Sequence, residues 1–338
     1  MAKVSVLGAG SWGTALAVML HGNHHQVTLW SALSDEVAQL RRDREQKGKL
    51  PGVHIPEDIV ITDCLEEAVK DREMLVLAVP SVFVRGTARQ LSGLVPEGQL
   101  IVCVAKGVEE DTLMTMTDII EQELPMVDAA VLSGPSHAEE AGKGIPTTCV
   151  AGAHTRQTAE HIQNLFMSET FRVYTSPDML GIELGAALKN VVALAAGIAD
   201  GLGYGDNTKA ALITRGMAEI SRLGIAMGGK IETFYGLSGI GDLIVTCASV
   251  HSRNRRAGYL IGQGCTMQEA MDQVKMVVEG VYSAKAAREL AEKYQVEMPI
   301  VEEVNKVLFE GKSAKAAVMD LMLRDKKVEA PVISWNEE

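Results

Sequence analysis

The sequence predicts an α/β fold: a doubly wound, largely parallel sheet followed by an all-helical C-terminal domain. Short β-branched runs alternate with helical patterns over the first half of the chain, as in sheets whose strands are joined by crossover helices. After Pro177 the pattern changes to long helical stretches rich in Ala and Met, and no further convincing strand follows. We therefore expect two domains, residues 1–177 and residues 178–338.

The expected strands of the first domain are short and apolar, and a helical pattern lies between most of them. Strands are expected at Val4–Leu7, Val27–Trp30, Ile59–Thr62, Met74–Ala78, Leu100–Val104, Ala129–Ser133, Thr147–Ala151 and Arg172–Tyr174. Helices between them are expected at Thr14–Leu20, Val82–Leu91, Leu113–Glu123 and Ala159–Met167. Ligands of such sheets bind at the carboxyl ends of the strands, so the loops that follow the strands are where we expect the site.

The first strand leads into a G-x-G-x-x-G motif formed by Gly8, Gly10 and Gly13, and a helix follows. Gly8 can adopt the dihedral angles of a tight turn. The missing Cβ of Gly10 lets a pyrophosphate approach the backbone, and Gly13 lets the helix pack closely on the strand. A chain with 32 glycines contains such spacings by chance. The strand before the motif and the helix after it nevertheless favour a Rossmann-type dinucleotide-binding domain.

The composition is that of a globular protein with an acidic balance. The chain has 338 residues, of which 47% are hydrophobic and 22% charged, and its net charge is −12. This length allows two domains with cores of their own. The charge argues against nucleic acids and anionic membranes as partners, so an anionic substrate would need a locally basic pocket.

The cysteines and the apolar segments bear on the compartment. We interpret the five scattered cysteines as reduced thiols of a cytoplasmic protein, with neither disulfides nor a metal site: Cys64, Cys103, Cys149, Cys247 and Cys265. The uncharged stretch between Lys3 and Leu20 superficially resembles a signal peptide, but it contains the patterned glycines and leads into a second strand. No other segment reaches the length of a membrane span, so we expect no membrane insertion.

Lys189 lies in a helical segment, residues 184–197, that is apolar on nearly every side and is therefore expected to be buried. A buried lysine is costly unless it is paired or faces an internal cavity, and burial lowers its pKa toward neutrality. Lys189 is thus either a proton carrier or a structural lysine that is salt-bridged or snorkels to the surface. Its neighbour Asn190 is either a polar helix residue or a second substrate contact.

Two further candidates follow strands of the first domain. Lys106 comes directly after the strand Leu100–Val104, where the cofactor is expected, although a solvated loop lysine is the alternative. Gly134 and Ser136 form a turn whose hydroxyl and N–H groups suit a phosphate or hydroxyl ligand. Taken alone, this turn is better explained as a strand-to-helix connection in which Ser136 caps the next helix.

The helical domain offers a carboxylate and a basic cluster. Asp242 ends a glycine-rich turn, where it either caps the run Leu243–Cys247 or holds a cationic lysine in position. Residues 252–256, Ser-Arg-Asn-Arg-Arg, are the densest positive cluster of this acidic chain. Guanidinium groups match phosphate oxygens in pairs, which modestly favours an anion site over a solvated helix face.

Seven segments together carry a resemblance to a known family: Gly8–Gly13, Ala105–Gly107, Ser133–Ser136, Leu188–Asn190, Gly239–Asp242, Ser252–Arg256 and Val278–Gly280. In this order, over about residues 4 to 310, the chain resembles the soluble NAD(P)-dependent glycerol-3-phosphate dehydrogenases of bacteria. The resemblance implies a cytoplasmic homodimer of two-domain subunits. It also implies reversible reduction of dihydroxyacetone phosphate to sn-glycerol 3-phosphate by hydride transfer, which supplies glycerophospholipid synthesis.

The resemblance further implies roles for single residues. Lys189 would protonate the carbonyl oxygen as the hydride arrives, Lys106 would contact both substrate and nicotinamide, and Asp242 would orient Lys189. The expected substrate contacts are Lys106, Gly134, Ser136, Lys189, Asn190, Asp242, Ser252, Arg253 and Asn254. The expected cofactor contacts are Gly8, Gly10, Ser11, Trp12, Gly13, Ser31, Ala32, Lys106, Ala138, Arg253, Val277 and Glu279.

The end of the second strand bears on the choice of cofactor. NAD-selective sites of this type carry Asp or Glu there to hold the ribose 2′-hydroxyl. This chain has Ser31 and Ala32 instead, with no carboxylate before Asp35 and no arginine before Arg41. Without a repelling carboxylate, Ser31 could donate to a 2′-phosphate, so we expect NADP(H) to be preferred and NAD(H) to be possible.

Two other functions fit part of the pattern. A β-hydroxyacid dehydrogenase also couples a Rossmann domain to a helical domain with a buried lysine, but its carboxylate substrates need no arginine-rich phosphate cluster. A non-catalytic nucleotide sensor would have no reason to bring Lys106, Lys189 and Asp242 together at the nicotinamide. The motifs therefore favour an oxidoreductase that acts on a small phosphorylated three-carbon substrate.

Overall fold

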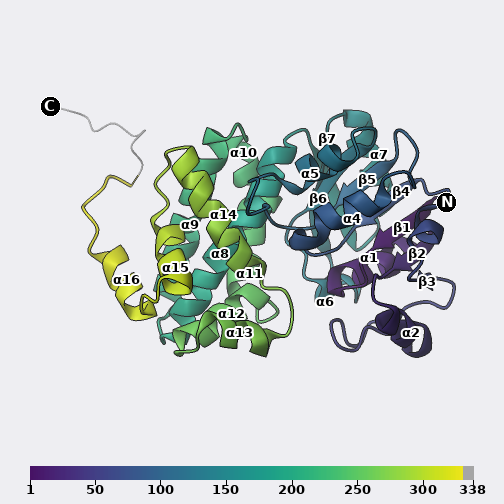
Figure 1. The fold of residues 1–338 in the computed structure, drawn as a ribbon. Coiled ribbons are helices and arrows are strands. Elements are labelled where there is room, and N and C mark those ends of the chain that lie inside the picture. Colours follow the sequence, from purple (N-terminus) through teal and green to yellow (C-terminus); the bar gives the residue numbers. More distant parts are fainter. Residues whose placement is uncertain (330–338) are drawn as a thin grey trace.

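The computed structural model describes residues 1–329, in which a sheet flanked by helices lies beside a helical C-terminal domain (Figure 1). All eight predicted strands are present and form a single sheet, in the order β3-β2-β1-β4-β5-β6-β7-β8. The strands are β1 (Lys3–Leu7), β2 (Gln26–Trp30), β3 (Val60–Thr62), β4 (Met74–Leu77), β5 (Leu100–Cys103), β6 (Asp128–Ser133), β7 (Thr147–Ala153) and β8 (Phe171–Ser176).

The first six strands have the 3-2-1-4-5-6 order of a Rossmann-type sheet and run parallel. β7 then pairs antiparallel to β6, with Ala130 opposite Ala153, and β8 runs parallel to β7. The strand order reverses between β1 and β4, and ligands of open α/β sheets bind at this point, beyond the carboxyl ends of the strands. Topology alone therefore places the site next to Gly8.

Helices cover both faces of this sheet, so its central strands are buried on both sides and form nearly continuous apolar runs. Val4 and Val6 of β1 face one core, which Leu16 of α1 and Phe166 of α7 complete. Leu7 faces the opposite core, to which α4 and α5 contribute. The helices of this part are α1 (Ser11–Gly22), α2 (Ser34–Asp43), α3 (Leu65–Val69), α4 (Val84–Leu91), α5 (Met116–Glu123), α6 (Ala138–Ala141) and α7 (Arg156–Phe166).

Two of these helices begin later than the sequence predicts. The segment from Val82 starts inside a 3₁₀ turn, Ser81–Phe83, and α4 begins only at Val84. The helix expected from Leu113 begins at Met116, because Leu113 has φ +61° and Thr115 caps the helix. The Thr115 hydroxyl accepts from the N–H of Asp118 and the Asp118 carboxylate accepts in return, which fixes the first turn at this position.

The C-terminal domain consists of helices packed around α8 (Met179–Gly201), whose apolar window is completely buried, as in the core helix of a soluble protein. The other helices are α9 (Asp206–Ala226), α10 (Ile231–Phe234), α11 (Asp242–Ala248), α12 (Arg253–Gly262), α13 (Met267–Val274), α14 (Glu279–Lys293), α15 (Pro299–Phe309) and α16 (Ala314–Met322). A short π-helical turn, Leu237–Gly241, precedes α11. Of the domain expected over residues 178–338, residues 330–338 lie outside the described part of the chain.

Helices α8 and α12 cross in direct backbone contact. A Cβ atom on Gly197 would lie 2.0 Å from the carbonyl oxygen of Arg255, and one on Gly258 would lie 2.1 Å from that of Leu194. Only glycine fits at such a crossing. The contact holds the start of α12, with its basic cluster, beside the part of α8 that carries Lys189.

Candidate active site

The loop between β1 and α1 has the geometry that a pyrophosphate requires. Gly8 has φ +124°, and a Cβ on Gly13 would lie 1.9 Å from the Gly8 carbonyl oxygen, so both positions require glycine. A Cβ on Gly10 would meet nothing within 4 Å, and no side chain caps the start of α1. Open space therefore adjoins the free N–H groups at this helix terminus, and the residues present fit a dinucleotide phosphate.

The other predicted cofactor contacts of this region lie around the same loop. Ser11 donates from its hydroxyl to the carbonyl oxygen of Lys49, 2.7 Å away. Trp12 is half-buried and packs against a small cluster that includes Ala138, the first residue of α6. Ala32 is exposed, directly beyond β2.

The hydrogen bonding of Ser31, at the end of β2, differs from what the sequence had led us to expect. Ser31 is buried, and its hydroxyl donates to Oε2 of Glu36 at 2.6 Å. Glu36, in the first turn of α2, thereby supplies a carboxylate at the place where the sequence has none. The Ser31 hydroxyl is engaged by this carboxylate, so the expectation that it donates to a 2′-phosphate is not supported. Oε1 of Glu36 also accepts from Gln46 at 2.9 Å and from Lys49 at 2.5 Å, which balances its charge.

Three charged residues from different elements meet between the two parts of the molecule. Lys106 follows β5, Lys189 lies in the middle of α8, and Asp242 is the first residue of α11. Nζ of Lys106 lies 2.8 Å from Oδ2 of Asp242, and Nζ of Lys189 lies 2.9 Å from Oδ1. The side chains of Lys189 and Asp242 are only 6% and 2% exposed. Asp242 therefore holds both lysines, and its side chain does not cap α11.

The hydrogen bonds of the two ammonium groups distinguish their roles, since each ammonium has three N–H donors. Nζ of Lys106 contacts Asp242, the carbonyl oxygen of Gly134 at 2.9 Å and the hydroxyl of Ser136 at 3.2 Å, so all three donors are used. Nζ of Lys189 contacts Asp242 and the hydroxyl of Thr246 at 2.6 Å. Within residues 1–329, Lys189 thus retains one N–H for a ligand.

The electrostatics of this triad favour proton transfer by Lys189. Burial, together with the neighbouring charge of Lys106, lowers its pKa to about 8 against the opposing effect of Asp242. Burial by itself would raise the pKa of Asp242, but the charges of Lys106 and Lys189 hold it below its usual value. A lysine that titrates near neutrality beside an ionised carboxylate is suited to general acid–base chemistry.

The turn at the end of β6 faces Lys106. Gly134 has φ +151°, and a Cβ there would lie 2.8 Å from the carbonyl oxygen of Thr148. The hydroxyl of Ser136 donates to the Gly134 carbonyl oxygen at 2.9 Å and accepts from Lys106. Ser136 does not cap the next helix, as its sequence context had suggested, because His137 occupies the N-cap position of α6.

Asn190 and Asn254 form a chain of amide hydrogen bonds. Asn190 donates to the carbonyl oxygens of Lys106 at 3.1 Å and Ala186 at 3.4 Å, so both of its N–H donors are used. Its oxygen accepts from Asn254 at 2.9 Å, and the oxygen of Asn254 accepts from the N–H of Gly280. Among the described residues, Asn254 keeps one N–H without a partner, whereas Asn190 ties the lysine loop to α8.

The basic cluster at the start of α12 is only partly available to a ligand. The buried hydroxyl of Ser252 accepts from the N–H of Arg255 and caps the helix. The guanidinium of Arg255 is bound to Asp200, with Nε 2.7 Å from Oδ2. Arg253 and Arg256 are exposed. Of the two, Arg253 lies near enough to Glu279 to influence its pKa.

Glu279 joins the helical domain to the loop after β4. Its carboxylate accepts from the N–H of Ser81 at 3.1 Å and from the Ser81 hydroxyl at 2.5 Å. Burial raises the pKa of Glu279, while these hydrogen bonds and the charge of Arg253 oppose that rise. Val277, the other predicted contact of this segment, is half-buried just before α14.

Four residues around the site were not singled out from the sequence: Ser81, Thr246, Glu36 and Lys49. Thr246 lies four residues after Asp242 on α11, so helical spacing could have indicated that the two share a face. Ser81 follows β4 in a loop of small residues at the carboxyl edge of the sheet, and this position could have marked it as a candidate site residue. Nothing in the sequence shows that Glu36 turns back toward Ser31.

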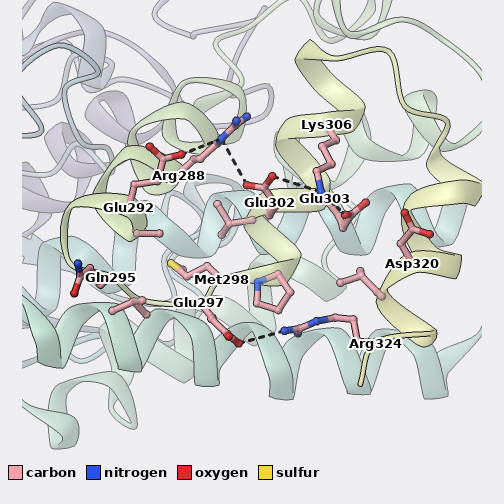
Figure 2. A pocket seen from close by; sticks show the side chains of 15 residues that line it. Arg288, Glu292, Gln295, Glu297, Met298, Glu302, Glu303, Lys306, Asp320 and Arg324 are labelled. Carbon is pink, nitrogen blue, oxygen red and sulfur yellow. Dashed lines mark hydrogen bonds and ion pairs between the residues drawn. The ribbon is translucent and has the colours of Figure 1, made fainter. Parts of the chain in front are cut away.

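A separate cavity of about 520 Å³ lies in the helical domain, bordered by α14, α15 and α16 (Figure 2). Its apolar wall includes Met298, Pro299 and Leu321. Most of the charged side chains at its rim pair with one another, as Arg324 does with Glu297 at 3.3 Å. None of its lining residues is among those predicted for the site.

Comparisons with known proteins agree with this arrangement. Residues 3–159 match the family model described as NAD-dependent glycerol-3-phosphate dehydrogenase N-terminus, and residues 178–319 match the C-terminus of the same family. A glycerol-3-phosphate dehydrogenase (NAD(P)+) of Agathobacter rectalis is 64% identical over 335 residues, 99% of this chain and 100% of that protein.

More distant relatives extend the similarity to a solved structure. A glycerol-3-phosphate dehydrogenase (NAD(P)+) of Fusobacterium nucleatum is 62% identical and covers 99% of this chain and 100% of its own. The crystal structure of glycerol-3-phosphate dehydrogenase from Coxiella burnetii superposes with a TM-score of 0.92 at 35% identity, covering 96% of this chain and 99% of that one. The family models cover both parts of the molecule and the relatives cover nearly its whole length, so the chain belongs to the NAD-dependent glycerol-3-phosphate dehydrogenase family.

Proposed function

We propose that this protein reduces dihydroxyacetone phosphate to sn-glycerol 3-phosphate, reversibly, with Lys189 as the proton donor. The observation that carries the proposal is the single unused N–H of Lys189 at the carboxyl edge of the sheet. A β-hydroxyacid dehydrogenase and a nucleotide sensor are disfavoured by the family membership. The direct test is the loss of absorbance at 340 nm when the protein is mixed with NADPH or NADH and dihydroxyacetone phosphate.

The nicotinamide cofactor supplies the hydride when it is bound. Gly8, Gly10 and Gly13 would hold its pyrophosphate against the start of α1, and the loop after β4 with Ser81 and Glu279 would border its reactive end. The proton that the carbonyl oxygen takes up must then come from a group of the protein. The free N–H of Lys189 can stabilise the negative charge that develops on the carbonyl oxygen and then protonate it.

Lys106 and Asp242 act as positioning groups in this proposal. Asp242 keeps Lys189 in place and raises its pKa, which burial lowers. The three N–H donors of Lys106 are bound to protein atoms, and they fix the turn of Gly134 and Ser136 against the triad. If Lys106 contacts substrate as the family resemblance implies, it must give up one of these bonds.

We propose that the start of α12 binds the substrate phosphate. Arg253 is exposed beside the buried Ser252, and Asn254 retains an N–H that no residue of the described range 1–329 accepts. The guanidinium of Arg255, in the same segment as Arg253, is already paired with the carboxylate of Asp200. Arg253 therefore supplies the principal charge-assisted contact.

Arg253→Ala is expected to lower kcat/KM for dihydroxyacetone phosphate by about 30- to 150-fold, the effect of losing about 2 to 3 kcal/mol from a hydrogen bond to a charged group. Steady-state kinetics with dihydroxyacetone, which lacks the phosphate, should show almost no further loss. Arg256→Ala is the matched control, and we expect it to stay within about threefold of the parent. Equal losses on both substrates would assign Arg253 to the cofactor or the fold.

For the cofactor, we propose that the site accepts both NADH and NADPH. The preference for NADP(H) expected from the sequence loses its basis, because the Ser31 hydroxyl is bound to Glu36. Glu36 can accept from a ribose 2′-hydroxyl, and Lys49, which balances its charge, can pair with a 2′-phosphate. Neither cofactor is therefore strongly rejected.

Glu36→Gln is expected to raise the NADPH/NADH ratio of kcat/KM by about tenfold, since it removes a negative charge and leaves the charge of Lys49 unbalanced. Both values are measured at fixed salt with saturating dihydroxyacetone phosphate. Asp35→Asn, a charge removal at the exposed neighbouring position, is the control and should change the ratio less than twofold. An unchanged ratio in Glu36→Gln would show that the 2′-position does not reach this carboxylate.

We further propose that the enzyme works in the cytoplasm as a homodimer and supplies glycerophospholipid synthesis. All five cysteines are free, as in a reducing compartment. The dimer rests on the family resemblance, and light scattering coupled to size-exclusion chromatography tests it directly.

A further inference from the structure

Gln46 is a buried glutamine that joins two parts of the proposed cofactor site. It follows α2 in the chain and is only 3% exposed. Its Nε2 atom donates to the carbonyl oxygen of Ala9 and to Oε1 of Glu36, both at 2.9 Å. Ala9 stands between Gly8 and Gly10 in the pyrophosphate loop. The two N–H donors of one side chain are thus shared between this loop and the carboxylate beyond β2.

The backbone of Gln46 holds a third part of the same site. Its carbonyl oxygen accepts from the N–H of Lys49 at 3.1 Å and from that of Leu50 at 2.7 Å, which closes the turn that carries Lys49. The carbonyl oxygen of Lys49 in turn accepts from the hydroxyl of Ser11, the first residue of α1. Gln46 therefore contacts the pyrophosphate loop, the carboxylate and the segment of the lysine that balances its charge.

The hydrogen bonds of Glu36 show where a ribose hydroxyl can bind. A carboxylate has about four acceptor positions, two on each oxygen. Oε1 accepts from Gln46 and from Nζ of Lys49, so both of its positions are used. Oε2 accepts from the hydroxyl of Ser31. Within the described part of the chain, Oε2 thus keeps one position without a donor, and the side chain of Glu36 is 12% exposed, so a ligand can reach it.

The distance between the pyrophosphate loop and Glu36 matters because one cofactor molecule must contact both. Its pyrophosphate and its adenosine ribose are covalently joined, so the two protein contacts must be held at a matching separation. We propose that Gln46 is a positioning residue that holds Glu36 at this separation from the loop and thereby favours cofactors with a free ribose 2′-hydroxyl. The inference rests on the proposed function, in which Glu36 accepts from that hydroxyl.

The test measures cofactor binding without substrate, so it does not depend on turnover. The two ligands are NAD+ and its analogue with 2′-deoxyribose on the adenine side, and their affinities are measured by isothermal titration calorimetry at fixed salt. We expect the parent to bind NAD+ about tenfold more tightly than the analogue, the effect of one hydrogen bond to a charged group. Any contribution of the pyrophosphate loop alone is the same for both ligands.

Gln46→Met keeps the length of the side chain and removes both donors. The carbonyl oxygen of Ala9 still has the Thr14 hydroxyl at 3.4 Å, and Glu36 still has Ser31 and Lys49. In this variant the preference for NAD+ over the analogue should fall to about threefold or less. The reason is that the carboxylate loses its direct link to the loop and no longer meets the hydroxyl in the right place.

A double variant tests whether Gln46 acts through Glu36. Glu36→Gln alone should also reduce the preference to about threefold, because the acceptor loses its charge. Adding Gln46→Met to Glu36→Gln should then leave the preference unchanged, since the carboxylate that Gln46 positions is already gone. A purely structural effect of Gln46 would instead weaken both ligands equally in either background.

Gln99→Met is the matched control, because it makes the same substitution at another buried glutamine of the sheet domain. Gln99 is 4% exposed, and its Nε2 donates to the carbonyl oxygen of Leu100 at 3.2 Å. It directly precedes β5, at the amino edge of the sheet, whereas the pyrophosphate loop lies at the carboxyl edge. This control should keep the parent's preference whatever its melting temperature. Gln46→Leu replaces Gln46→Met if the latter does not fold.

The outcomes separate the possible failures. A Gln46→Met protein that keeps the parent's preference, with or without an equal loss on both ligands, would overturn the inference and leave Gln46 a structural residue of the loop. If Glu36→Gln reduces the preference in the same experiment, the proposed contact of Glu36 is retained and this inference alone fails. A parent that binds both ligands equally would overturn the proposed role of Glu36 and the inference with it.

Discussion

Lys189→Met is expected to reduce kcat by about 100-fold or more in both directions of the reaction, the effect of losing a positioned general acid. Methionine preserves the length of the side chain within the buried helix α8. Asp242 remains paired with Lys106, so no unpaired carboxylate is left behind. Turnover is followed at 340 nm with dihydroxyacetone phosphate and, in reverse, with sn-glycerol 3-phosphate.

The loss must be confined to the chemical step. Cofactor affinity, from fluorescence titration, and the melting temperature should both stay near the parent values. Lys209→Met is the matched control, because this lysine of the same domain is also salt-bridged, to Asp200 at 3.0 Å, but stands outside the triad. Near-parent turnover in both directions would remove Lys189 from the mechanism and leave Lys106 as the candidate donor.

Asp242→Asn is expected to affect both stability and the pH dependence of the reaction. The substitution leaves two ammonium groups facing a neutral amide in a buried site, which should cost about 3 to 5 kcal/mol of unfolding free energy. In the parent, reduction requires protonated Lys189, so its rate falls as the pH rises through about 8, and oxidation falls as the pH drops through the same value. Asp242 raises the pKa of Lys189, so in Asp242→Asn both limbs should move to lower pH.

The measurements are urea unfolding and kcat–pH profiles in both directions. Asp200→Asn is a suitable control, because Asp200 also lies between two cations, Lys209 and Arg255. This control should lose stability and keep the parent's pH profile. An unshifted profile in Asp242→Asn would show that Asp242 does not set the pKa of the proton donor.

The central strands of the fold were predictable because they are buried apolar runs, and the crossover pattern of helices then specifies a largely parallel sheet. Helix starts were less predictable. Leu113 and Val82 are apolar residues in helical periodicity, yet Leu113 has a positive φ angle and Val82 lies in a 3₁₀ turn. The first residue of a helix is set by capping interactions such as that of Thr115, and the periodicity of apolar residues carries no information about such caps.

Some residues of the site could likewise be recognised from the sequence, whereas their contacts could be seen only in the structure. A lysine in an apolar helix and an aspartate after a glycine turn are unusual locally, so Lys189 and Asp242 could be singled out from the sequence. The contact between Ser31 and Glu36 depends on how α2 turns back after β2. The count of free N–H donors on Lys106 and Lys189 likewise depends on atoms from several distant segments.

The position of the lysine triad has a consequence for how this protein can be regulated or altered. Asp242 receives one lysine from the sheet domain and one from the helical domain. In the proposed reaction the hydride comes from a molecule seated on the first domain, while the proton comes from the second. The two domains thus each supply one part of the reduction. The carboxylate of Asp242, which binds a lysine from each domain, keeps the proton donor in position relative to the hydride donor. A substitution remote from every ligand can therefore slow turnover while both binding steps stay intact, merely by tilting one domain against the other.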